Sequence, residues 1–265
     1  MSLSNQVVEE LAGDLLKRER SGSAGDALTE KYPDIGLDDA YRVQLHNIDV
    51  KLKEGIRIVG KKIGLTSRGM QKLAGIDQPD FGYLLSDMVV DSNVISFSKY
   101  RLQRPRVEGE LAFVLREDLK GPNVTTLDVL LATDYIVGSF EIIDSRIRDW
   151  KLVKFFDTVA DNASSALYVL GEKKLKVTDI DLAMTGMSVF KNGELINSGI
   201  GAEAMDNPAW CVAWLANKLS EYGVVLKKGE TVLSGALVAA IDAAPGDHFE
   251  ARFSKLGTVQ LKFVD

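Results

Sequence analysis

The stretch RPRVEGELAFVL (residues 104–115) carries two glutamates inside a run that has the period of a β-strand. Alternate side chains of an extended strand share a face, so Glu108 and Glu110 point the same way, together with Ala112 and Val114. Two neighbouring carboxylates repel each other, and loss of water raises the cost unless a cation neutralises them. The pattern indicates either a hard divalent cation at this face or two glutamates that lie in solvent.

A third acidic residue, Glu141, lies within the otherwise apolar strand segment DYIVGSFEII (residues 134–143). An acidic side chain is costly there unless it is paired or binds a cation, so we predict Glu141 as a third metal ligand. Asp144 has the opposite phase and is followed closely by Arg146, which favours a structural ion pair between them. Three glutamates from two strands would form an oxygen-only site with positions left for a substrate.

Two adjacent lysines, Lys61 and Lys62, lie in the β-branched run IRIVGKKIGLT (residues 56–66). On a strand they point to opposite faces, and both faces carry aliphatic residues. One of them could be drawn inward, where an ammonium would stabilise an enolate or move a proton. The alternative is that both ammonium groups reach water, and the spacing alone does not decide between these outcomes.

Cysteine and histidine are scarce in this chain. A single cysteine, Cys211, excludes an internal disulfide and zinc sites made of several thiolates, and its place on an apolar helix stripe predicts a core position. The two histidines, His46 and His248, show no recognisable metal or triad spacing. A histidine-based hydrolytic site is therefore disfavoured.

The first third of the chain has helical periodicity. Apolar residues recur at helical spacing behind Ser4, which is a suitable cap, and a second helix should run from Asp38 to Gly55. A short helix is expected from Ser67 to Gly75. We therefore expect a helical N-terminal subdomain over residues 1–80.

Strand signals dominate from about residue 87 onward, including the segment MVVDSNVISF (residues 88–97). Asn192-Gly193 is a strong two-residue hairpin signal. One clear helix interrupts this region, with Asn207 as its cap and Gly223 after its end. The sequence thus predicts an α+β fold with a β-rich catalytic domain over residues 81–265.

Bulk composition narrows the class of protein. The 265 residues are 46% hydrophobic and 26% charged, with a net charge of -6, which is a poor match for nucleic acid or anionic membranes. No segment approaches the ~20 apolar residues of a membrane span, and the charged N-terminal stretch is unlike a signal peptide. We expect a soluble, cytoplasmic enzyme with a small-molecule substrate.

Several segments, in their order and at their separations, resemble the 2-oxopent-4-enoate (2-hydroxypenta-2,4-dienoate) hydratases and the related 4-oxalocrotonate decarboxylases of the fumarylacetoacetate hydrolase superfamily. The resemblance runs nearly end to end and implies a mixed β-roll or barrel body and a homo-oligomer. The segments are GKKIGLTS, IDQPDFGYL, RPRVEGELAFVL, FEIIDSRIRDW, DTVADNASS, NPAWCVAWLANKL, LSGAL and PGD.

The resemblance also implies roles for individual residues. The family's metal glutamates fall on Glu108, Glu110 and Glu141, which would hold Mg²⁺ or Mn²⁺. Its pocket lysine falls on Lys62 rather than Lys61, and the aspartate of its Gln-Pro-Asp-Phe-Gly segment is Asp80, the candidate for proton transfer. Ser164 would bind the substrate carboxylate. Without the resemblance, Asp80 could equally be a turn cap and Ser164 a local loop contact.

The implied activity is a Mg²⁺-dependent hydro-lyase of the meta-cleavage route of aromatic catabolism, which adds water to 2-hydroxypenta-2,4-dienoate and forms 4-hydroxy-2-oxopentanoate. The stretch from Asp144 to Ser165 resembles the hydratases more than the decarboxylases. Met205-Asp206 replaces the family's usual Leu-Gly pair, which leaves the specificity for the substrate tail open. The alternatives are a 4-oxalocrotonate (2-oxo-hex-3-enedioate) decarboxylase and a non-catalytic subunit that binds 2-oxo acids.

Overall fold

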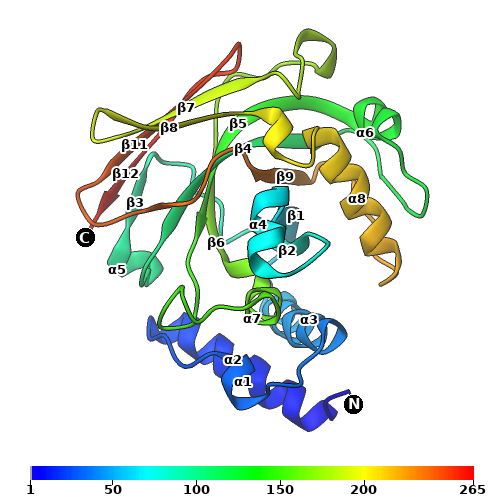
Figure 1. Ribbon diagram of the computed structural model, residues 1–265, viewed down its shortest axis with the longest axis vertical. Helices are drawn as coiled ribbons and strands as arrows, with labels where there is room; N and C mark the ends of the chain where they lie inside the picture. The colour runs from blue at the N-terminus through cyan, green and yellow to red at the C-terminus, as the bar shows by residue number, and fades with distance from the viewer. Residues whose placement is uncertain (1) are drawn as a thin grey trace.

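A computed structural model describes residues 2–265 and places the N-terminal helices at one end of a curled β-sheet body (Figure 1). The predicted α+β organisation is confirmed. The helices are α1 (Asn5–Ser21), α2 (Leu28–Lys31), α3 (Leu37–Lys53), α4 (Arg68–Ala74), α5 (Phe97–Tyr100), α6 (Thr126–Ala132), α7 (Phe155–Ala160) and α8 (Pro208–Ser220). The strands are β1 (Ile58–Gly64), β2 (Asp80–Leu85), β3 (Val94–Ser96), β4 (Arg106–Leu115), β5 (Thr133–Ile143), β6 (Ser165–Leu170), β7 (Gly186–Lys191), β8 (Glu194–Ile200), β9 (Thr231–Ala236), β10 (Ile241–Asp242), β11 (His248–Phe253) and β12 (Gly257–Val264).

The N-terminal helices form where their caps and apolar stripes predict them. The Ser4 hydroxyl accepts a hydrogen bond from the amide of Val7, and α1 ends at Gly22 in the left-handed conformation. The predicted second helix corresponds to α3 and begins one residue before Asp38. Figure 1 shows α1, α2 and α3 gathered beside α7, below the sheet body. This arrangement lets the N-terminal helices support the segment around α7.

The larger sheet contains the two acidic strands at its centre. Its strand order is β2-β1-β9-β4-β5-β6, with β10 also paired to β4. Neighbours are antiparallel except for β1 and β9, which are parallel. In the register of β4 and β5, Glu108 lies opposite Glu141, and Glu110 lies opposite Ser139. The three glutamates therefore share one face of the sheet.

The smaller sheet covers the opposite face of these strands. Its order is β3-β12-β11-β7-β8, and the predicted Asn192-Gly193 turn joins β7 to β8 with both residues at positive φ. The rings of Phe140 and Phe249 meet edge to face, 6.5 Å apart, between the sheets. A Cβ on Gly109 would lie 2.4 Å from the sulfur of Met187, so the two sheets pack closely at this glycine. The small sheet therefore packs against one face of β4 and β5, and the three glutamates lie on the opposite face.

Two expectations about the β-rich part are wrong in detail. The segment from Met88 to Phe97 is a strand only over Val94–Ser96. Besides α8, this part of the chain contains the short helices α5, α6 and α7. Thr125 caps α6 through reciprocal hydrogen bonds with Asp128. This capping box is a local sequence signal, but the segments on either side have the periodicity of strands.

The first eighty residues contribute more than helices, because β1 joins the large sheet through β2 and β9. The division into a helical subdomain (1–80) and a β-rich catalytic domain (81–265) stays a prediction. Within residues 2–265, no helix combines the length and apolar character needed to cross a bilayer.

Candidate active site

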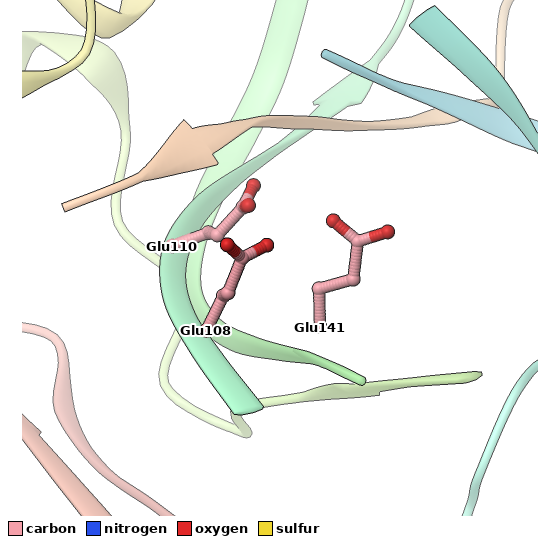
Figure 2. Close-up of side chains that lie close together, drawn as sticks. All are labelled: Glu108, Glu110 and Glu141. Atoms are coloured by element: carbon pink, nitrogen blue, oxygen red, sulfur yellow. The ribbon is translucent and has the colours of Figure 1, made fainter. Parts of the chain in front are cut away.

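Three carboxylates converge on one face of the large sheet (Figure 2). Glu108 and Glu110 come from β4, and Glu141 comes from the neighbouring strand β5. One carboxylate oxygen from each lies within 4.8 Å of the others. This convergence follows from alternation along each strand and from the pairing of Glu108 with Glu141 across the strands.

The environment of these carboxylates fits a cation. Glu141 is fully buried, and neither of its carboxylate oxygens accepts a hydrogen bond from another described residue. Burial raises the pKa of Glu108 to about 7, and burial with the charges of Glu141 and Glu108 raises the pKa of Glu110 well above its usual range. Buried like charges are costly when unpaired, so this donor set suits a hard divalent ion.

The backbone also orients one of the three glutamates. The amide of Gly235 in β9 donates a hydrogen bond of 2.8 Å to Oε2 of Glu110. Gly235 has a φ of +103°, and a Cβ there would lie 2.3 Å from the Thr66 hydroxyl. Both observations require glycine at this position. Gly235 was not predicted as a site residue, although the glycine of the LSGAL segment was a signal for it.

Lys62 supplies a positive charge beside the glutamates. Its Nζ lies 3.5 Å from Oε1 of Glu141, and the side chain is buried. Burial alone would lower the pKa of Lys62, but the carboxylates of Glu141, Asp80 and Glu108 outweigh it and hold this pKa above its usual value. One ammonium faces several carboxylates, so the cluster retains excess negative charge that a divalent ion would balance.

Lys61 lies on the opposite face, as alternation predicts. Its ammonium donates to both carboxylate oxygens of Glu230, at 2.6 and 2.7 Å, and lies 5.7 Å from the centre of the Tyr83 ring. The exposed fractions of Lys61 and Lys62 are 2% and 3%, so the alternative in which both ammonium groups reach water is wrong. Of the two lysines, Lys62 is the one placed near the three glutamates.

Asp80 begins β2 and lies opposite Gly64 of β1. It is buried, and its Oδ1 accepts no hydrogen bond from another described residue. A Cβ on Gly64 would lie 2.2 Å from this oxygen and 3.2 Å from Nζ of Lys62. Burial raises the pKa of Asp80, against the opposing effect of Lys62. Asp80 is thus a buried carboxyl group close to the ammonium, which suits it to hold or transfer a proton.

Ser164 ends the short 3-10 turn η1 (Asn162–Ser164), where all three residues have positive φ. Its hydroxyl oxygen lies 3.1 Å from that of Thr158 on α7. Thr158 was not among the predicted site residues. No periodicity predicts this contact, since a left-handed turn separates the two residues.

A cavity of about 800 Å³ lies beside these groups, within the size range of small-molecule sites. Its polar lining includes Lys62, Asp80, Glu108, Thr158 and Ser164. Apolar side chains line the remainder, among them Ile143, Val153, Phe155, Leu237 and Val238. The cavity can therefore accept a molecule with one charged end and one hydrocarbon end.

Other sequence predictions have mixed outcomes. Cys211 is buried, as predicted. The ion pair expected between Asp144 and Arg146 is wrong: Arg146 pairs with Asp161, while Asp144 accepts the backbone amides of Gln103 and Arg104. Asp161 follows α7, and its approach to Arg146 depends on the tertiary fold.

The Met205-Asp206 pair has an unusual backbone. Both residues have positive φ, and Asp206 forms an ion pair with Arg68 at the start of α4. Arg68 and Asp206 are both largely exposed, so their ion pair is a surface contact. It joins two segments that flank the cavity-lining residues Ser67 and Glu203.

Comparisons with known proteins agree with this architecture. The family model described as fumarylacetoacetate (FAA) hydrolase C-terminal matches residues 67–264. A 2-hydroxyhexa-2,4-dienoate hydratase from Comamonas testosteroni is 41% identical over 261 residues, which cover 98% of each chain. A 2-keto-4-pentenoate hydratase from Paraburkholderia xenovorans is 42% identical over 262 residues, covering 98% of this chain and 96% of the relative.

Among solved structures, 4-oxalocrotonate decarboxylase from Pseudomonas putida G7, complexed with magnesium and adipate, is similar with a TM-score of 0.95. The two chains are 34% identical, and the match covers 99% of each. The similarity therefore includes the N-terminal helices as well as the β-sheet body.

Proposed function

This chain belongs to the fumarylacetoacetate hydrolase family, and from that premise we propose that it is a hydratase acting on 2-hydroxypenta-2,4-dienoate. The reaction adds one water molecule and gives 4-hydroxy-2-oxopentanoate, a step of the meta-cleavage breakdown of aromatic compounds. End-to-end similarity to two hydratases supports the reaction class. The observation that carries the chemistry is the convergence of three glutamates, with Lys62 beside them, next to a half-apolar cavity.

We assign Mg²⁺ to Glu108, Glu110 and Glu141, because it prefers oxygen ligands and usually keeps positions for water or substrate. Mn²⁺ accepts the same ligands. When bound, the ion supplies Lewis-acid stabilisation of negative charge on the substrate's 2-oxygen. The buried oxygens of Glu141, which lack hydrogen bonds from other described residues, support this assignment.

Lys62 and Asp80 are assigned to the proton transfer that prepares the substrate for water. The Asp80 carboxylate accepts the proton of the 2-hydroxyl group, and its acid form delivers a proton to C5. The Lys62 ammonium stabilises the negative charge that develops on the 2-oxygen during this exchange. The resulting C2 ketone is conjugated with the C3–C4 double bond, so C4 becomes electrophilic.

Ser164 is assigned to the 1-carboxylate of the substrate, where its hydroxyl can donate a hydrogen bond. The apolar wall that includes Ile143 and Phe155 would receive the hydrocarbon tail. Water then attacks C4, and C3 takes up the proton that the water loses. Atoms balance with one water consumed, and no oxidant or reductant is needed.

The proposed activity is tested with purified protein, Mg²⁺ and 2-hydroxypenta-2,4-dienoate. We expect loss of the dienol absorbance and a product heavier than the substrate by one water, identified by mass spectrometry as 4-hydroxy-2-oxopentanoate. The Glu141→Gln variant, measured in parallel, should be inactive at the same metal concentration. Absence of turnover by the wild-type protein on this and related dienoates would favour a non-catalytic subunit that binds 2-oxo acids.

A decarboxylase is the second candidate, favoured by the structural similarity to 4-oxalocrotonate decarboxylase at a TM-score of 0.95. Such an enzyme would release CO₂ from 2-oxo-hex-3-enedioate and use the same charge stabilisation at the 2-oxygen. Measuring CO₂ release on this substrate beside hydration of the pentadienoate separates the two activities. We expect faster hydration, since the two hydratases are 41% and 42% identical to this chain and the decarboxylase 34%.

A further inference from the structure

We propose that Thr158 is a positioning residue for the substrate carboxylate: its hydroxyl orients Ser164 so that the pair presents one O–H donor to the cavity. The inference rests on the proposed function, in which Ser164 binds this carboxylate. It adds a second hydroxyl that would determine how tightly the substrate is held. The hydroxyl pair, defined as Thr158 Oγ1 and Ser164 Oγ, lies at the cavity wall, since both residues line it.

The first observation is the direction of the Thr158 side chain. A threonine inside a helix commonly turns its hydroxyl back to a carbonyl one turn earlier. Here the backbone amide of Thr158 donates to the Lys154 carbonyl at 3.1 Å. Among the bonds of the described residues, the Thr158 hydroxyl instead meets Ser164 at 3.1 Å. The Thr158 hydroxyl therefore contacts the turn that contains Ser164 and not a carbonyl of its own helix.

The second observation is that the backbone of Ser164 is fixed on both sides. Its amide donates to the Asp161 carbonyl at 2.9 Å, and its own carbonyl accepts the amide of Asp144 at 2.9 Å. Its φ of +54° is one that non-glycine residues adopt rarely. Such a conformation persists only where the surroundings hold it, and it occurs often at ligand sites. The side-chain hydroxyl is what remains for an interaction with a ligand.

The third observation is that two buried carboxylates fasten the segment that carries both hydroxyls. Asp157 accepts bonds from the amide and the hydroxyl of Thr29, at 2.9 and 2.8 Å, which ties α7 to α2. Asp161 pairs with the buried guanidinium of Arg146. Thr158 and Ser164 therefore lie on either side of Asp161 on a braced backbone. Their separation is set by the fold and needs no adjustment when a substrate arrives.

The chemistry of the pair follows from its hydrogen count. Each hydroxyl has one hydrogen, and one of the two hydrogens is used between the oxygens. In the proposed arrangement Thr158 donates to the Ser164 oxygen, and the hydrogen of Ser164 is then available toward the cavity. Because hydrogen bonds in a chain polarise one another, the outward donor is stronger than an isolated hydroxyl. An anionic carboxylate is the acceptor that gains most from this arrangement.

The test compares Thr158→Val, which keeps the shape and removes the hydroxyl, with Thr158→Ser, which keeps the hydroxyl. Loss of one orienting hydrogen bond should raise KM and the Kd for oxalate roughly threefold to tenfold, with kcat within about twofold. Oxalate binding to the Mg²⁺-loaded protein is measured by calorimetry. Thr158→Ser should restore both values. Adding Ser164→Ala to Thr158→Val should weaken oxalate binding less than Ser164→Ala does in the wild type, because the two hydroxyls act as a unit.

The proposal is overturned if Thr158→Val leaves both KM and oxalate affinity unchanged, or if Thr158→Ser is as impaired as Thr158→Val. Additive effects of the two substitutions would contradict it as well. Should Thr158→Val fail to fold, Thr158→Ala takes its place with the same expectations. The Kd for Mg²⁺ should stay within about twofold in every variant, which excludes a distorted metal site. Oxalate binding needs no turnover, so failure of the hydratase assay in the wild type leaves this test intact.

Discussion

The ammonium of Lys62 lies 3.5 Å from a carboxylate oxygen of Glu141, although β1 and β5 are separated in the sheet by β9 and β4. The sheet is curled (Figure 1), and the two side chains meet although two strands lie between β1 and β5. A positive charge is thereby held beside the proposed metal ligands without being adjacent to them in sequence. The catalytic proposal depends on this relationship.

Replacing Lys62 by alanine should lower kcat roughly 10²–10³-fold, since one electrostatic donor at a developing oxyanion contributes about 2.7–4 kcal/mol. The matched control is Lys61→Ala, which removes the neighbouring buried lysine on the other face. That change removes the ammonium from Glu230, which keeps the amide of Lys227 as a donor, and should lower the free energy of unfolding while kcat of the folded enzyme stays within about threefold. A loss below threefold for Lys62→Ala would remove this residue from the mechanism.

Glu141→Gln should weaken Mg²⁺ binding by at least about 100-fold, because an amide replaces a charged ligand at the buried end of the site. Isothermal calorimetry on metal-free protein provides the Kd. Glu194→Gln, on the exposed strand β8, makes the same chemical change away from the site and should leave the Kd unaltered. Equal affinities for the two variants would show that Glu141 is not a ligand.

Metal affinity should increase with pH through about 7. In the metal-free protein burial raises the pKa of Glu108 to about 7, so below this pH a proton must leave as the ion binds. The Kd should fall up to about tenfold per pH unit for each proton displaced, and then level off. Calorimetry in buffers of different ionisation enthalpy measures the proton release directly. A Kd that does not change between about pH 5.5 and about pH 8 would contradict the burial of the cluster.

The same pKa shift predicts how stability depends on pH. A carboxyl group whose pKa is higher when folded favours folding at low pH, and this contribution is lost as pH rises through the folded value of about 7. The Tm of metal-free protein should therefore decrease between about pH 5.5 and about pH 8 relative to that of Mg²⁺-saturated protein. Scanning calorimetry of the metal-free and the Mg²⁺-saturated protein measures both Tm values as a function of pH. A difference between the two Tm values that does not change with pH would contradict the prediction.

Asp161→Asn should lower the free energy of unfolding by about 3–5 kcal/mol, because it leaves the buried guanidinium of Arg146 without its counter-charge. The control is Asp49→Asn, which breaks the exposed pair with Lys53 and should cost less than about 1 kcal/mol. Urea unfolding of the three proteins provides the comparison. Similar midpoints for both variants would mean that the buried pair does not brace the turn.

The sequence was most informative where the direction of a side chain depends only on alternation along its own strand. Alternation placed Glu108 and Glu110 on one face, and the apolar context of Glu141 marked it as unusual. The pairing of the two strands, which brings Glu141 opposite Glu108, depends on the register between the strands, and alternation within each strand does not determine that register. The helix caps at Ser4 and Asn207 were predictable because their bonds are local.

The limits of prediction have physical causes. Lys61 and Lys62 could not be distinguished because both faces of β1 are buried, and each ammonium finds its carboxylate on a distant segment. The predicted partner of Arg146, Asp144, was wrong because the true partner, Asp161, approaches Arg146 only through the tertiary fold. The left-handed turn ending at Ser164 contains no glycine, so nothing in its composition indicated that its residues have positive φ.

The central claim is that one ion is shared by three glutamates and receives a chelating 2-oxo acid. A crystal structure of the protein with Mg²⁺ and oxalate tests it most directly. We expect one ion with an oxygen of Glu108, Glu110 and Glu141 each at about 2.0–2.1 Å, and oxalate completing the coordination within the cavity. An ion bound elsewhere, or bound with Glu141 turned away from it, would contradict the claim.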